Sequence, residues 1–182
     1  DALRFSLDMG VAPGGDVRVS NEKFEAFRNF ANKVWNAARF VLMNLKNEAP
    51  APLSAIDPAL LEGPDRWVLT KYNEAIRGVT AGLESYDLGL SAQKIYDFAW
   101  SEFCDWYIEM AKPRLADEAG APVARAVLYH VLIGLLKLLH PFMPFITDEV
   151  YHHLPGTEGS IMVSSWPETD AALDFPEDEA RM

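Results

Sequence analysis

Apolar residues recur at helical spacing over most of the chain. The first long pattern runs from Ser20 to Lys46 and alternates steps of three and four residues through about seven turns. Ser20 is a good N-cap residue, because its hydroxyl can accept a hydrogen bond from a backbone N–H in the first turn. The pattern therefore predicts an amphipathic helix. Its apolar positions are Phe24, Phe27, Ala31, Val34, Ala38, Val41, Leu42 and Leu45.

Later segments repeat this period. Asp87 can cap a helix that Pro113 should end, and Pro122 suits the first turn of the following helix. Gly78 and Gly82 lie four residues apart in the helix expected over 65–86. They either permit close contact with another helix or simply weaken their own helix. The expected ranges are 65–86, 88–112, 122–139 and 145–154. The helix expected over 65–86 has an apolar stripe of Leu69, Tyr72, Ile76, Val79, Leu83 and Tyr86.

The remaining segments are irregular. Residues 2–9 predict a short helix, and residues 47–64 hold four prolines, which indicate an ordered connector. Residues 160–166 resemble a short strand, and the acidic tail after them is expected to be extended or poorly ordered. The fold class is therefore all-α, an antiparallel helical bundle over residues 1–155, with an extended C-terminal segment over 156–182.

Composition agrees with a folded domain and excludes some classes of protein. Hydrophobic residues make up 49% of the chain, which is enough for a packed core. No apolar stretch reaches the roughly 18 residues that span a bilayer, so we expect no membrane contact. One cysteine and no leader-like segment predict a cytoplasmic protein. Because the chain opens on Asp1, we expect a piece of a longer protein whose catalytic centre lies elsewhere.

Charge is unevenly distributed along the chain. The net charge of −11 argues against nucleic acid, because phosphate binding usually requires clustered Lys and Arg. Between Arg18 and Lys46, however, six basic residues face two acidic ones, a local charge of +4. A polyanion could approach this region while the rest of the surface repels it, or the basic side chains are simply a solvated helix face.

Catalytic signatures are lacking in the sequence. The paired Gly14 and Gly15 do not belong to a phosphate-binding loop. His152 and His153 point about 100° apart on a helix, so they would not bind one metal together. Cys104 lies among aromatic residues, where an inert buried thiol is expected. We predict no catalytic residue, no metal site and no cofactor in this chain.

Phe40 is an anomaly in the first long helix. At about 100° per residue it falls nearly opposite the apolar stripe centred on Val34, Ala38 and Leu45. Either it packs on another element of the bundle, or it is a platform on which an unpaired base stacks. In the second interpretation its polar neighbours would meet base edges and phosphate. Those neighbours are Asn29, Lys33, Asn36 and Asn44.

Several segments resemble, in the same order, the valine branch of the class I aminoacyl-tRNA synthetases. The most distinctive is WSEFCDWYIEMAKP at 100–113, whose many large side chains make chance similarity improbable. The segment at 135–151 is shared with leucine and isoleucine enzymes, whereas RNFANK and WSEFCDWY favour valine. The others are DALRF at 1–5, GGDVR at 14–18, RNFANKVWNAARFVLMN at 28–44, LLKLLHPFMPFITDEVY at 135–151 and SSWPE at 164–168.

The resemblance implies a helical anticodon-binding domain that binds valine tRNA. A catalytic domain elsewhere would activate valine with ATP and magnesium, and catalytic and C-terminal domains would be its partners in a monomer. Valine codons begin with GU, so the anticodon has A in its middle position and C in its third. The family's anticodon-contacting residues fall on Arg18, Lys33, Phe40 and Ile108. Helical geometry adds Asn36 and Asn44.

In this interpretation Arg18 contacts phosphate or a base edge, Lys33 supplies charge, Phe40 stacks and Ile108 forms an apolar wall. Two alternatives remain. The chain could belong to an isoleucine or leucine enzyme of the same class. It could instead be an acidic helical protein-interaction module with Phe40 as an apolar anchor.

Overall fold

The computed structural model describes residues 1–9 and 20–179. Within these ranges every regular element is a helix, which confirms the all-α prediction. The helices are α1 (Ala2–Asp8), α2 (Asn21–Leu45), α3 (Gly63–Glu84), α4 (Leu88–Asp97), the π-helix η3 (Phe98–Tyr107), α5 (Ile108–Ala116), α6 (Ala121–Leu139), α7 (Pro144–His153) and α8 (Pro176–Glu179). Short 3-10 turns are η1 (Leu53–Ala55), η2 (Pro58–Leu60), η4 (Ile161–Val163) and η5 (Ala171–Leu173).

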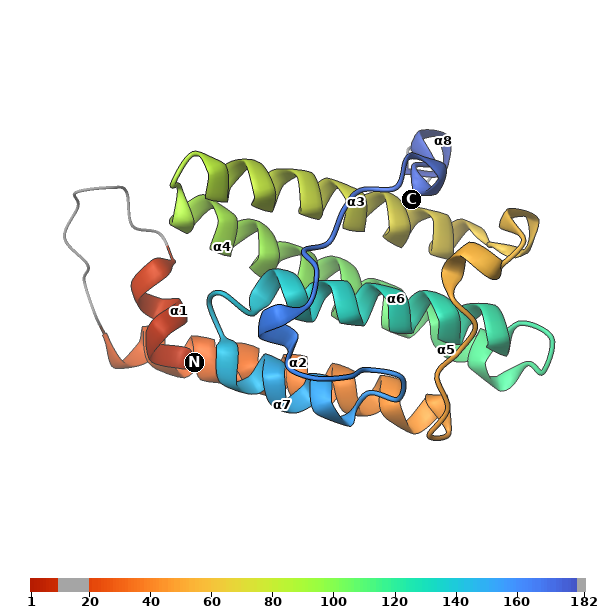
Figure 1. Cartoon of the computed structure of the whole chain (residues 1–182), viewed down its shortest axis with the longest axis horizontal. Helices are drawn as coiled ribbons and strands as arrows, with labels where there is room; N and C mark the ends of the chain where they lie inside the picture. Colours follow the sequence, from red (N-terminus) through yellow and green to blue (C-terminus); the bar gives the residue numbers. More distant parts are fainter. Residues whose placement is uncertain (10–19, 180–182) are drawn as a thin grey trace.

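The long helices form an antiparallel bundle (Figure 1). α2, the continuous α4–η3–α5 helix and α7 run in one direction, while α3 and α6 run in the other. α1 packs against the first half of α2, and the C-terminal segment crosses the bundle from α7 towards α3. The helical core therefore lies between α2, α3, α6 and the α4–η3–α5 helix.

Polar caps set several helix starts as predicted. The Ser20 hydroxyl accepts a hydrogen bond from Lys23 N at 3.2 Å, and the Asp87 carboxylate accepts one from Leu90 N at 3.0 Å. α3 begins earlier than predicted, at Gly63, because the Asp65 carboxylate reaches back to accept Glu62 N at 3.0 Å. Each of these helices therefore begins where a side-chain oxygen accepts a hydrogen bond from a backbone N–H at the helix start.

Pro113 does not end its helix, so that prediction is wrong. The helix continues through the proline to Ala116. Proline inside a helix usually costs about 3 kcal/mol, because it removes one hydrogen bond and clashes with the preceding turn. Here the next residue, Arg114, is held by ion pairs to Asp65 and Glu62, the latter at 3.1 Å. These contacts with the start of α3 stabilise the final turn.

Asp65 is the most deeply buried carboxylate described, with 1% of its surface exposed. The Tyr107 hydroxyl donates to Oδ1 at 2.8 Å, and the Arg114 guanidinium pairs with Oδ2. Burial is the main reason that the pKa of Tyr107 is raised well above its ordinary value, and the negative charge of Asp65 raises it further. The Tyr107 hydroxyl therefore remains a donor. This network joins the start of α3 to the end of η3 and to α5.

The buried face of α2 is broader than the sequence pattern predicts. Phe30 is fully buried and meets Phe5 and Tyr96 at ring-centroid distances of 5.3 and 4.8 Å, yet it was absent from the predicted stripe. Ala37 is buried as well. Both residues move the centre of the buried face towards Phe40. The buried residues are Phe27, Phe30, Val34, Ala37, Ala38, Val41 and Leu45.

α6 corrects the expectation that no segment is long and apolar enough to span a membrane. It has 19 residues and a mean hydropathy of 1.6 in its most apolar window. However, 67% of that window is buried inside the bundle, where α6 packs against α2, α3, α4, α5 and α7. Its composition is therefore that of a central core helix.

The C-terminal segment is extended but bound to α3. Asn73 donates to Asp170 O at 2.8 Å, and Trp166 Nε1 donates to Thr80 Oγ1 at 3.0 Å. The predicted strand over 160–166 is wrong, because this stretch contains the 3-10 turn η4 and no strand partner lies among the described residues. The division of the chain at residue 155 remains a prediction.

Three glycines permit close helix contacts. A Cβ at Gly78 would lie 2.6 Å from Lys94 Cδ, and one at Gly82 would overlap the Ser91 hydroxyl, so α3 and α4 approach closely there. This supports the first of the two interpretations of these glycines. Gly134 on α6 makes room for the Tyr72 ring in the same way.

Tyr86, which was predicted to belong to the packing stripe of α3, is 84% exposed, so that prediction is wrong.

We predict that Gly134→Ala destabilises the protein by about 1–3 kcal/mol, because the added methyl group would overlap the Tyr72 hydroxyl. Urea unfolding followed by circular dichroism measures the change. Gly63→Ala is the matched control, since its methyl group would meet nothing within 4 Å, and its stability should change by less than about 0.5 kcal/mol. Equal stability of the two variants would contradict the close contact.

Candidate functional site

The predicted site residues come from two neighbouring helices. Lys33, Asn36, Phe40 and Asn44 lie on α2, and Ile108 is the first residue of α5. α2 runs in the same direction as the η3–α5 helix (Figure 1), and it contacts η3. Arg18, the remaining predicted residue, lies outside the described residues. The structure therefore places the α2 residues on a helix that contacts η3, whereas Ile108 begins α5 and is buried.

Phe40 lies at the edge of the core and not nearly opposite it. The ring is half-buried, packs against the core, and has Lys112 Nζ 5.9 Å from its centroid. The predicted angle was wrong because Phe30 and Ala37 move the buried face towards Phe40. Phe40 thus packs on its neighbours while part of its surface stays open beside a cation, a setting that suits aromatic stacking.

Lys33 already has two partners inside the bundle. Its ammonium lies 2.5 Å from Asp105 Oδ1 and 3.8 Å from the centroid of the Trp100 ring. The Lys33 side chain is 23% exposed and that of Asp105 is 50% exposed. Because the carboxylate is the more accessible partner, an approaching phosphate would meet its negative charge as well as the ammonium. Lys33 is therefore not a free charge.

The other site residues differ in accessibility. Asn36 is exposed, and the half-buried Asn44 donates from Nδ2 to Phe40 O at 2.8 Å. Ile108 is buried, with 6% of its surface exposed, so its side chain contributes mainly to the core. Of the predicted set, Asn36 and Phe40 thus offer accessible groups beside the η3–α5 helix.

Sequence reasoning missed Lys112 as a neighbour of Phe40. It is exposed and pairs with Glu109 at 2.6 Å while lying near the Phe40 ring. It also overlooked Trp106, which is 61% exposed on η3. Spacing alone does not reveal these positions, because a π-helix turns less per residue than an α-helix and shifts every later residue around the axis.

Cys104 has the properties of an inert thiol. Burial raises its pKa to about 12, against the opposing charge of Lys33. The thiol therefore stays protonated at neutral pH and is a poor nucleophile. Among residues 1–9 and 20–179, no group of three or more His, Cys, Asp or Glu side chains is arranged to hold a metal ion.

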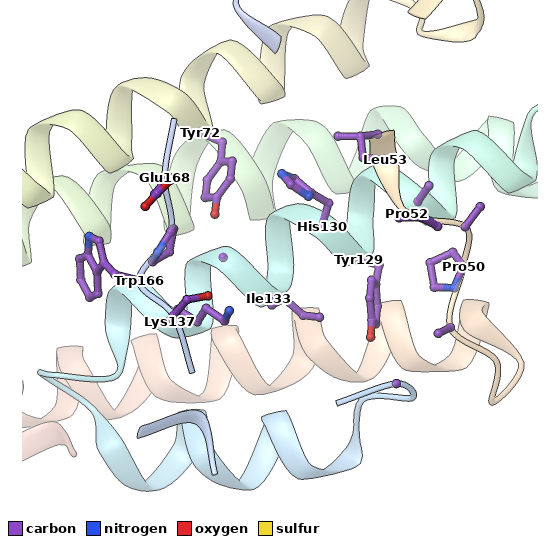
Figure 2. A pocket seen from close by; sticks show the side chains of 17 residues that line it. Pro50, Pro52, Leu53, Tyr72, Tyr129, His130, Ile133, Lys137, Trp166 and Glu168 are labelled. Atoms are coloured by element: carbon purple, nitrogen blue, oxygen red, sulfur yellow. The ribbon is translucent and has the colours of Figure 1, made fainter. Parts of the chain in front are cut away.

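A cavity of about 650 Å³ lies between α6, Tyr72 of α3, the connector and the C-terminal segment. Figure 2 shows Tyr72 and His130 pointing into this space, with Lys137 and Trp166 nearby. The His130 ring meets the Tyr72 ring edge-on at a centroid distance of 5.6 Å. Burial lowers the pKa of His130, against the opposing charge of Asp170. This cavity contains none of the predicted site residues.

Comparison with known proteins identifies a family. The model of the family described as the anticodon-binding domain of tRNA ligase matches residues 65–182. The chain is 50% identical over 175 residues to a valine–tRNA ligase of Clostridium acetobutylicum, covering 95% of this chain and 20% of that protein. It is 48% identical to a valine–tRNA ligase of Carboxydothermus hydrogenoformans, covering 97% of this chain and 20% of that protein.

A solved structure supports the fold. The chain is similar, with a TM-score of 0.71 and 21% identity, to LeuRS from Agrobacterium radiobacter K84 in a ternary complex with tRNA and LeuAMS. The match covers 94% of this chain and 20% of that one. At this identity the likeness establishes a shared helical architecture. The chain spans about a fifth of the length of the relatives that it matches.

We predict that stability falls as the pH is lowered from about 7.5 to 5.5. The unfolded chain binds a proton at His130 near pH 6.5, whereas burial lowers the pKa of the folded residue, so protonation favours unfolding. Burial lowers the pKa of His140 too. His130→Gln should reduce the slope, measured by urea unfolding at several pH values, while His152→Gln, an exposed control, should not. Identical slopes for wild type and His130→Gln would contradict this assignment.

Proposed function

We propose, since the chain belongs to the family of anticodon-binding domains of tRNA ligases, that it binds the anticodon end of valine tRNA. The observation that carries this proposal is its 44–50% identity to valine–tRNA ligases over nearly its whole length. The chain would be one part of such a ligase in the cytoplasm, acting as a monomer. Activation of valine with ATP and magnesium would take place in another part of that protein.

The binding face consists of the exposed side of α2 next to the η3–α5 helix. The open part of the Phe40 ring would stack on one anticodon base, and the Asn36 amide would meet a base edge. Lys33 would contact phosphate once its pairing with Asp105 loosens. In this proposal the middle A and the third C of the anticodon are read, since all valine anticodons share them.

The alternatives are less well supported. The 44–50% identity to valine–tRNA ligases over nearly the whole chain supports valine rather than leucine or isoleucine. A protein-interaction module would use Phe40 as a deeply inserted anchor. The half-buried Phe40 ring already packs against the core, so it cannot be inserted deeply into a partner, whereas its open part can still take up a stacked base.

We predict that Phe40→Leu weakens binding of valine tRNA to the full-length protein by roughly fivefold or more, while Phe40→Tyr does not. Leucine keeps the packing but removes the aromatic surface on which a base would stack. Filter binding measures the affinity, and charging kinetics give an independent readout. Phe145→Leu, at an exposed aromatic residue on α7, is the control.

The same measurement with altered tRNA tests the proposed function itself. Replacing the middle and third anticodon bases should weaken binding to the wild type, and Phe40→Leu should add little further loss for that tRNA. Thermal unfolding should show all variants folded. If the altered tRNA binds the wild type as tightly as valine tRNA does, the anticodon proposal is wrong.

We predict opposite effects for the two partners of the Lys33 ion pair. Asp105→Asn should tighten tRNA binding, because it removes a negative charge and frees the ammonium. Lys33→Gln should weaken binding and reduce the slope of log K against log salt by about 0.7. Surface pairs contribute only about 0–1 kcal/mol, so both variants should fold. Weaker binding by Asp105→Asn would show that the pair itself is the recognition element.

A further inference from the structure

A second row of side chains lies on α2, away from the Phe40 face. We call Arg28, Trp35, Arg39 and Lys46 the outer ridge of α2. The spacing of seven and four residues places Arg28, Trp35 and Arg39 on one side of the helix, and Lys46 is its C-cap residue. All four are exposed, and Trp35 shows 43% of its surface. At 1.5 Å per residue the ridge extends about 27 Å, which is long enough to follow several nucleotides.

Within the described part of the chain, the three cations of the ridge differ from the other cations near the site. Arg28, Arg39 and Lys46 make no ion pair or hydrogen bond through their side chains to any described residue. In contrast, Lys33, Arg77 and Lys112 each pair with a carboxylate. Moreover, α2 contains no acidic residue after Glu25. In a chain of net charge −11, the ridge is thus a cationic strip, and Glu25, three residues before Arg28, is the acidic residue of α2 next to it.

Trp35 adds an aromatic surface to this strip. Together with Arg39 it borders a small hollow of about 140 Å³ between α2 and α7, whose other walls are Ala38, Leu42, Val150 and His153. The hollow is apolar except at its rim. An exposed indole between two unpaired arginines suits a flexible single strand, whose bases stack on the ring while its phosphates meet the cations.

We propose that the outer ridge of α2 binds the ribose-phosphate backbone of RNA next to the anticodon and stacks an unpaired base on Trp35. This inference rests on the proposed function, because it concerns the same tRNA. Arg39 adjoins Phe40 in the chain and lies about 100° from it around the helix. One loop lying across the outward side of α2 therefore reaches both faces. The ridge supplies affinity that is independent of sequence, and the Phe40 face discriminates between bases.

Charge substitutions test the cations. In the full-length protein, Arg28→Gln with Arg39→Gln should lower the slope of log K against log salt by about 1.4, since each phosphate contact to a single strand contributes about 0.7. Binding should weaken by a similar factor for valine tRNA and for tRNA with an altered anticodon. Arg77→Gln with Lys94→Gln removes the same charge from α3 and α4 and should leave the slope nearly unchanged.

Trp35 is tested separately. Trp35→Leu should weaken tRNA binding by roughly fivefold or more without changing the salt slope, and Trp35→Phe should restore most of the affinity, because stacking requires an aromatic ring. Equal weakening by Trp35→Leu and Trp35→Phe would overturn the stacking role. Thermal unfolding of both variants checks that the α2–α7 contact is intact.

The outcomes separate this inference from the proposed function. If altering the anticodon weakens binding but the ridge double variant behaves as its control does, the ridge proposal is wrong and anticodon binding stands. If the ridge variant loses binding together with thermal stability of the full-length protein, the ridge is a contact with another part of that protein, and the proposal again fails. If an altered anticodon has no effect on the wild type, anticodon binding fails whatever the ridge variants show.

Discussion

The buried carboxylate of Asp65 joins the start of α3 to the η3–α5 helix, which is one of the two helices of the candidate site. It begins α3 by accepting Glu62 N, receives the Tyr107 hydroxyl at the end of η3, and pairs with Arg114 in α5. A carboxylate with 1% exposure is stable only when its acceptors are filled, so these partners are interdependent. Removing one partner from such a buried network typically costs about 3–5 kcal/mol, because a charge is left uncompensated.

This network also fixes one side of the η3–α5 helix against α3. Because Tyr107 and Arg114 are anchored on Asp65, the opposite side of the same helix presents Asp105 to Lys33 and Lys112 to Phe40. The π-helical turn rotates the chain between these anchors. The charge environment of the binding face is therefore a consequence of a carboxylate that lies in the core and touches none of the proposed RNA contacts.

α2 has distinct chemistry around its circumference. One side is buried around Phe30 and Val34, and the adjoining edge carries Phe40 beside Lys112. The outer ridge carries Trp35 and three cations that pair with no residue in the ranges that the structure describes. Paired cations near the proposed base-reading face limit nonspecific attraction there, whereas the free cations of the ridge would attract any phosphate. Such a division would let a chain of net charge −11 bind RNA along a single helix, as we propose.

Local chemistry in the sequence determined the helices: Ser20 and Asp87 cap their own first turns, and the segments from 28–44 and 100–113 indicate the family. Only the tertiary structure decided that Ile108 is buried, that Pro113 stays within a helix, that Phe40 lies at the edge of the core, and that Lys33 pairs with Asp105, 72 residues away. The physical reason is the distance along the chain over which each kind of interaction acts. Caps and periodicity act within a turn, whereas burial and pairing depend on how distant helices are rotated and placed against one another.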